Sequence, residues 1–217
     1  MPDIDAVARS LADQIKKSRA DYLEARFEES RTSHITYRGK GLESIGRATA
    51  GGGNVRALKK GGWGFTSFNS FDKLTDRVDL AVEQARSAGR SRSKLAGIEP
   101  AVDEVPSGVA KNPVEIPLSE KKKLLDEYNE IIWSTPQIQT STIGYSDSSK
   151  KVVFLNSEGS YITQERADVS LRLTAIAAKD GEVQQVGLSL GSRGDFSAIE
   201  GLHQQVEEMA RHAVGLL

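Results

Sequence analysis

The stretch that decides the fold of this chain runs from Gly51 to Phe65 and reads GGGNVRALKKGGWGF. A glycine triplet opens it, a turn of two lysines and a glycine divides it, and a single glycine separates Trp63 from Phe65 at its end. Glycine-rich segments cradle phosphate through exposed backbone N–H groups, or they form bent β-hairpins in which strands approach closely. We favour the hairpin, because no Gly-Lys-Ser/Thr sequence follows and no helix opens directly after the glycines.

The composition is that of an ordinary soluble chain. Its 217 residues suffice for one or two domains that each have a core. Of these residues, 38% are hydrophobic and 27% are charged. A net charge of −1 argues against a general nucleic-acid-binding protein. There is no cysteine, which excludes disulfides and thiolate metal sites. No signal peptide is visible at Met1–Asp5 and no apolar run could cross a bilayer, so we expect a cytoplasmic protein without membrane contact.

Before this stretch, the pattern predicts one helix and three strands. The helix rests on apolar residues at helical spacing: Ile4, Val7, Ala8, Leu11 and Ile15. Apolar and polar residues alternate strictly over Tyr22–Glu28, which predicts a strand with one solvent-exposed face. His34–Arg38 and Leu42–Ala48 are the second and third strand candidates, with a glycine turn between them.

After it, the pattern predicts a helix that begins at Ser70 and stops at Gly89. From residue 90 to residue 117 the chain becomes rich in proline, which predicts an extended connector without packed elements. The basic, serine-rich cluster Arg90–Lys94 opens this connector. A solvated loop is the favoured interpretation of that cluster, and contact with nucleic acid is the alternative.

The second half again reads as helix, strands and helix. Ser119 is expected to cap a helix that ends before Pro136. The predicted strands are 138–145, 151–156, 161–165, 169–175 and 183–190, with a polar turn at Ser146–Ser149 and a hairpin turn at Asp180-Gly181. A capping box at Ser197–Glu200 is expected to open the last helix.

These elements predict an α+β fold with two repeats, each made of a helix, antiparallel strands and a helix. Repeat 1 covers about residues 1–89, the connector residues 90–117, and repeat 2 about residues 118–217. Antiparallel, hairpin-linked sheets with helices on one face are favoured, because the gaps between strands are too short for crossovers.

No catalytic apparatus is evident from residue chemistry. Of the three histidines, His34 is expected at the surface, while His203 and His212 fall on opposite faces of the last helix. Ser189 lies in a bare Gly-x-Ser-x-Gly pattern, but its alternating neighbours predict a residue within a strand and not a nucleophile elbow. Trp63 and Phe65 share one face of a strand, where packing in a core or an interface is the expected role.

Three segments resemble the TldD/PmbA family, also called modulators of DNA gyrase: Tyr22–Glu29, Gly53–Leu58 and Gly61–Ser67. The Val-Arg-Ala and Gly-Gly-Trp-Gly-Phe sequences are the most specific part, and the resemblance extends over essentially the whole chain. The tryptophan and the Tyr-x-x-x-Arg-x-Glu strand are closer to the TldD-like branch. The signature positions, to which we assign a structural role, are Arg26, Val55, Arg56, Gly61, Gly62, Trp63, Gly64 and Phe65.

This resemblance implies a part of a cytoplasmic zinc metallopeptidase that acts in peptide maturation and proteolysis. The family's His-Glu-x-x-x-His motif and its cysteine ligand lie in a C-terminal domain, and this sequence contains neither. We therefore expect residues 1–217 to be the N-terminal domain, inactive alone, without catalytic, cofactor-binding or metal residues, and with zinc only in a full-length protein.

The resemblance also implies that the N-terminal domain forms walls of an internal cavity and contributes to assembly. The implied partners are a peptide substrate and a second subunit, in a homodimer or a paralogous heterodimer of the full-length form. The alternative is an autonomous binding module for a protein or, through Arg90–Lys94, a weakly bound nucleic acid; nucleic acid is not the expected partner.

Overall fold

The computed structural model describes residues 4–89 and 95–217. The chain forms two compact units whose segments alternate along the sequence. Unit 1 contains the residues through Ser30, Thr49–Pro106 and Lys150–Glu165, and unit 2 contains Arg31–Ala48, Ser107–Ser149 and Arg166–Leu217. The chain passes from one unit to the other within long strands as well as in the connector.

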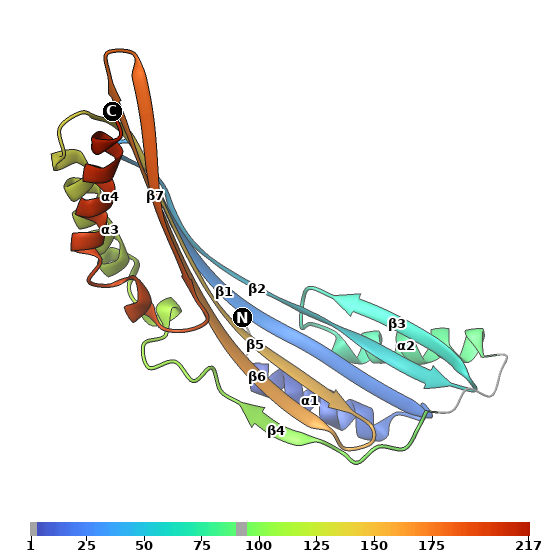
Figure 1. The fold of residues 1–217 in the computed structure, drawn as a ribbon. Helices are drawn as coiled ribbons and strands as arrows, with labels where there is room; N and C mark the ends of the chain where they lie inside the picture. The colour runs from blue at the N-terminus through green and yellow to red at the C-terminus, as the bar shows by residue number, and fades with distance from the viewer. Residues whose placement is uncertain (1–3, 90–94) are drawn as a thin grey trace. The chain divides into compact units, whose positions relative to one another are not determined.

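Figure 1 labels the helices and strands, which occur in runs along the chain. The elements are α1 (Ile4–Lys17), β1 (Tyr22–Arg38), β2 (Gly41–Lys59), β3 (Gly62–Phe68), α2 (Leu74–Ala88), β4 (Val102–Val105), η1 (Pro113–Glu115), α3 (Leu118–Ser134), β5 (Ile138–Asn156), β6 (Tyr161–Lys179), β7 (Glu182–Ser192), η2 (Phe196–Ile199) and α4 (His203–Gly215). The sheet has the order β3-β2-β1-β5-β6-β4, and β7 pairs with β6. The predicted α+β fold with a mainly antiparallel sheet is confirmed.

In unit 1, α1 and α2 pack on one face of the sheet. Their apolar stripes bury residues against alternate positions of β1, β2 and β5, including Leu23, Phe27, Val55 and Val153. The helix predicted from residue 4 is confirmed, and so is the stop of the next helix at Gly89.

The start predicted for α2 is wrong, because the helix begins at Leu74 and not at Ser70. The Ser70 hydroxyl donates to the Asp72 carboxylate at 2.8 Å and accepts from the Asp72 N–H at 3.3 Å. This local turn competes with helical hydrogen bonding. Lys73, which precedes the helix, has a left-handed backbone with φ of 53°.

In unit 2, α3 and α4 cover one face of the sheet. Tyr128 of α3 donates to the Ile199 carbonyl at 2.7 Å and accepts from the Leu202 N–H at 3.2 Å, which fixes the entry to α4. The last segment buries an apolar set against this face: Ile199, Leu202, Val206, Met209 and Ala213. The predicted capping box is wrong, because Asp195 caps a short 3-10 helix and α4 begins later, at His203.

Two boundaries in the second half also differ from prediction. Helix α3 begins at Leu118 after Pro117, so Ser119 lies inside its first turn and is not its cap. The polar turn predicted at Ser146–Ser149 is wrong, because β5 continues through it. Asp147 is buried there and is held by hydrogen bonds from neighbouring side chains, which lets a polar segment remain in a strand.

The described part of the predicted connector contains two short elements, the strand β4 and the 3-10 helix η1, so the expectation of a connector without packed elements is wrong. Strand β4 pairs with β6 in parallel, with Val102 opposite Tyr161, whereas the β2–β3 and β6–β7 pairs are antiparallel. The basic cluster Arg90–Lys94 lies outside the described residues. In residues 4–89 and 95–217, no helix has both the length and the apolar character to cross a membrane.

Candidate functional site

The glycine-rich stretch forms the predicted β-hairpin. Strands β2 and β3 pair antiparallel, with Lys59 opposite Gly62 and Val55 opposite Thr66. The two residues between the strands, Lys60 and Gly61, have positive φ values of 52° and 78°. Two successive positive φ angles define the type I′ turn, whose twist matches that of the flanking strands. The basic-glycine turn is confirmed.

Two of the signature glycines allow α2 to lie directly against β3. A Cβ atom at Gly64 would be 2.6 Å from the Ala85 nitrogen and still closer to the Ala81 carbonyl oxygen. A Cβ atom at Gly62 would meet the backbone of Ala85 and Gly89 at similarly short distances. Glycine is therefore required because a helix backbone occupies the space of a side chain.

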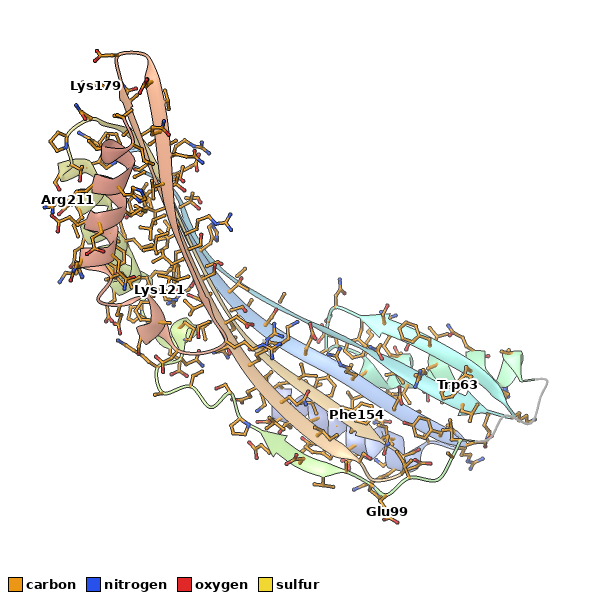
Figure 2. All side chains as sticks on the ribbon, viewed as in Figure 1. Trp63, Glu99, Lys121, Phe154, Lys179 and Arg211 are labelled. Carbon is orange, nitrogen blue, oxygen red and sulfur yellow. The ribbon has the colours of Figure 1, made fainter. Side chains whose placement is uncertain are left out.

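Trp63 and Phe65 lie on the opposite face of β3 from these glycines. They are 39% and 56% exposed, whereas Thr66 and Phe68, which alternate with them, are buried. Of the two expected roles, packing in a core is wrong for both residues, and packing at an interface stays a prediction. Because α2 occupies the glycine side of the strand, the aromatic side chains remain on the opposite face of unit 1, which none of the described helices covers and which we call the open face. Figure 2 labels Trp63 on this strand.

Trp63 is held by neighbours from β1 and β2. The Arg56 guanidinium lies 4.7 Å from the centroid of the Trp63 ring, and Arg56 Nε is 2.9 Å from Glu24 Oε1. The Tyr22 ring meets Trp63 edge to face at 6.2 Å, and its hydroxyl donates to Glu24 at 2.6 Å. Burial, followed by this hydrogen bond, raises the pKa of Tyr22 to about 12. The four side chains form one network, which we call the aromatic–arginine cluster.

A groove of about 400 Å³ lies beside the cluster on unit 1. Its lining residues are Arg26, Phe27, Glu28, Ser30, Ala50, Gly51, Gly52, Gly53, Asn54, Phe65 and Ser67. Strand β2 lies between β1 and β3, so its glycine triplet forms a floor without side chains. One wall carries Arg26 and Glu28, whose charged groups are 3.5 Å apart, and the other carries Phe65.

The structure separates the signature residues by face. Arg26, Arg56, Trp63 and Phe65 come together on the open face of unit 1, while Gly61 forms the turn. Val55 is buried in the core of unit 1, and Gly62 and Gly64 lie under α2. The signature therefore has two roles: its glycines and Val55 position the hairpin, and its arginines and aromatic residues form the exposed site.

A buried ionic cluster in unit 2 was not predicted. The Lys121 ammonium donates to Ser33 at 2.8 Å and to Asp147, while Ser33 and Tyr145 also donate to Asp147. Burial lowers the pKa of Lys121, and the hydrogen bond to Asp147 opposes that effect. Figure 2 labels Lys121, whose side chain is fully buried.

The sequence did contain a signal for this cluster. Lys121 stands on the apolar stripe of α3 at spacings of four and seven from Leu125 and Tyr128. A lysine in such a register is buried, and a buried lysine requires an acidic partner. The partner, Asp147, was missed because it was placed in a turn.

The remaining sequence candidates do not assemble a catalytic site. Ser189 lies within β7 opposite Arg172, as its alternating neighbours predicted. His34 is exposed on β1, as expected, and His203 forms a surface pair with Glu127 at 3.0 Å. Across the described ranges, no three His, Asp or Glu side chains form a group that could hold a metal. The donor set of these residues therefore does not fit a zinc centre.

We expect Trp63→Ala to lower the free energy of unfolding by roughly 1–2 kcal/mol, from the loss of one aromatic pair and one cation–π contact. Removal of a core tryptophan would cost about 3–5 kcal/mol. Urea denaturation followed by circular dichroism measures the difference. A loss of about 3–5 kcal/mol would contradict the surface position of Trp63. Val102→Ala provides a control at another exposed apolar residue of unit 1.

Two family descriptions match the chain in order. Residues 23–89 match PmbA/TldA metallopeptidase domain 1, and residues 111–217 match the PmbA/TldA metallopeptidase central domain. Among solved structures, a proposed modulator of a DNA gyrase from Thermotoga maritima superposes with a TM-score of 0.75 at 15% identity, covering 99% of this chain and 49% of that one. TldE from Thermococcus kodakarensis has a TM-score of 0.67 at 15% identity, over 98% and 46%.

Curated relatives are named metalloproteases. One from Synechocystis is 37% identical over 204 residues, which are 93% of this chain and 44% of the relative. Another, from Methanothermobacter thermautotrophicus, is 28% identical over 90% of this chain and 42% of its own length. The chain thus spans less than half the length of these relatives. By its sequence and its fold, the chain belongs to the TldD/PmbA metallopeptidase family.

Proposed function

We propose that this chain is the non-catalytic, cavity-shaping and assembly part of a TldD-like metallopeptidase that acts in peptide maturation and proteolysis. The observation that carries the proposal is the open face of unit 1, where Trp63 and Phe65 are exposed beside Arg26 and Arg56. Exposed aromatic residues held in place by neighbouring side chains are typical of surfaces that contact a ligand or a partner.

Two further observations support this role. The described residues provide no donor set for zinc, so the hydrolytic centre would come from another part of a full-length protein. The relatives named metalloproteases are more than twice as long as the segment that this chain matches. In the proposal, the full-length form holds the zinc and binds the peptide substrate. It assembles as a homodimer or a paralogous heterodimer, and it is located in the cytoplasm.

The sequence division into two repeats, about 1–89 and 118–217 with a connector at 90–117, stays a prediction within this proposal. Each repeat would contribute helices on one side of its strands and leave the other side open. That arrangement suits the wall of a substrate cavity, because a sheet that helices cover on one face leaves its second face free to contact the substrate.

A chimera tests the proposal. This chain would replace the matching 204 residues of the Synechocystis metalloprotease, and cleavage of a fluorescently quenched unstructured peptide would be followed with added zinc. We expect the chimera to cleave the peptide, and we expect the 217-residue chain alone neither to bind zinc stoichiometrically nor to cleave.

The control is the Synechocystis protein without its matching N-terminal segment. We expect that truncated protein to lose most of its activity, because no wall would confine the substrate. Cleavage by this chain alone would overturn the non-catalytic role. Equal activity of the truncated protein and the chimera would show that the N-terminal segment is not needed for peptide cleavage, which would contradict its cavity-shaping role.

A further inference from the structure

The open face of unit 1 exposes its cations more than its anions. The side chains of Arg26 and Arg56 are 53% and 49% exposed, whereas those of their partners Glu28 and Glu24 are 32% and 16% exposed. In each ion pair the arginine side chain is therefore more exposed than the glutamate side chain. A ligand that meets this face encounters mainly positive charge, although the four groups together are neutral.

The groove beside these arginines has an apolar wall and a floor of backbone. Arg56 lies opposite Phe65 in the β2–β3 register, so a cation and an exposed ring occupy adjacent positions on this face. Gly51–Gly53 place no side chains on the floor. An extended main chain can approach such a floor closely, because only backbone atoms limit the distance.

We propose that this groove binds an extended polypeptide segment in which an acidic residue is adjacent to an aromatic residue. The aromatic side chain would pack on Phe65, and the carboxylate would pair with the exposed guanidinium of Arg26 or Arg56. This inference rests on the proposed function, of which it names the substrate class. It assigns a selective role to three signature residues: Arg26, Arg56 and Phe65.

Single-stranded nucleic acid is the less suitable occupant of the same face. A nucleic-acid strand carries a phosphate at every nucleotide and needs a continuous cationic track. Here Glu24 and Glu28 stand on the same strand face as Arg26, so such a track is interrupted. An isolated carboxylate on a peptide can avoid these acidic groups, and a regular row of phosphates cannot.

Fluorescence anisotropy with labelled dodecapeptides tests the proposal. The probe is a glycine-serine peptide that carries one Phe flanked by two Glu, titrated with the 217-residue chain. We expect binding that weakens at least about fivefold when the two Glu are replaced by Lys, and by a similar factor when Phe is replaced by Ala. A twelve-nucleotide oligo-dT of the same label is expected to bind more weakly than the peptide.

Variants of the chain locate the site. We expect Arg26→Gln and Phe65→Ser each to weaken peptide binding at least about fivefold. Matched changes at exposed residues of unit 2, Arg172→Gln and Val183→Ser, should leave the dissociation constant unchanged. Circular dichroism establishes that all four variants are folded, as expected for substitutions at exposed positions.

Several results would overturn the proposal: no binding of the acidic peptide, equal binding of the lysine peptide, tighter binding of oligo-dT, or equal losses in the unit 2 variants. These outcomes are distinct from failure of the proposed function. If the chimera cleaves while the groove binds no acidic peptide, only the substrate class is wrong. If the isolated chain cleaves, the non-catalytic role is wrong whatever the groove binds.

Discussion

Gly64→Ala is expected to lower the free energy of unfolding by about 3 kcal/mol, at the upper end of the usual cost of overpacking. The added methyl group would lie 2.6 Å from the Ala85 nitrogen and closer still to the Ala81 carbonyl oxygen. Both are backbone atoms of α2, so no side-chain rotation can relieve the clash. The helix itself must move, and its buried face would lose contact with the unit 1 core.

Gly144→Ala is the matched control for this prediction. Gly144 also lies within a strand, β5, but an added Cβ atom there has no heavy atom within 4 Å. We expect this variant to be unchanged or to gain up to about 0.5 kcal/mol, because alanine restricts the unfolded chain. Urea titration monitored by circular dichroism gives both values. Equal stabilities of the two variants would show that α2 does not rest on β3 in solution.

Lys121→Met is expected to cost roughly 3–5 kcal/mol, the range found when one partner of a buried ion pair is removed. Asp147 would then keep hydrogen bonds from Ser33, at 2.5 Å, and from Tyr145, but no positive charge. Within residues 4–89 and 95–217, its second carboxylate oxygen, Oδ1, has no hydrogen-bond partner from the protein even in the intact cluster. The buried anion would therefore be poorly compensated.

The neighbouring lysine provides the comparison. Lys122 pairs with Asp126 at 2.6 Å on the partly exposed side of the same helix, and Lys122→Met should cost only about 0–1 kcal/mol. The double variant Lys121→Met/Asp147→Leu should recover part of the loss, since it removes both buried charges and leaves only Ser33 and Tyr145 to find new acceptors. If Lys121→Met were as mild as Lys122→Met, the cluster would not be buried in solution.

Local patterns predicted much of this fold. Helical spacing from Ile4 to Ile15 identified α1, and Lys60-Gly61 identified the hairpin turn, because these signals depend on residues close in sequence. The same local signals divided β5 wrongly at Ser146–Ser149. Those residues are polar, and one of them, Asp147, is buried within a strand because Lys121 and Ser33, both distant in sequence, donate to it together with Tyr145.

The candidate site shows a similar limit. Alternation placed Trp63 and Phe65 on one face, but it did not say which face α2 would cover. Gly62 and Gly64, which alternate with the two aromatic residues, mark the covered face, since a helix approaches a strand most closely where side chains are missing. The contact of Trp63 with Arg56 and Tyr22 depends on the strand order β3-β2-β1, which periodicity does not determine.

The alternation of the two units along the chain has a consequence for how the protein can be divided. Each unit is built from three separate segments, so no single cut releases either one whole. An expressed fragment of residues 23–89, matching domain 1 of the family, would lack Val153 and Leu155, which belong to the unit 1 core. Folding must therefore bring together residues more than 100 positions apart, and such non-local closure is slow. The boundaries of the family domains therefore differ from those of the compact units, and we expect fragments cut at the sequence boundaries alone to aggregate.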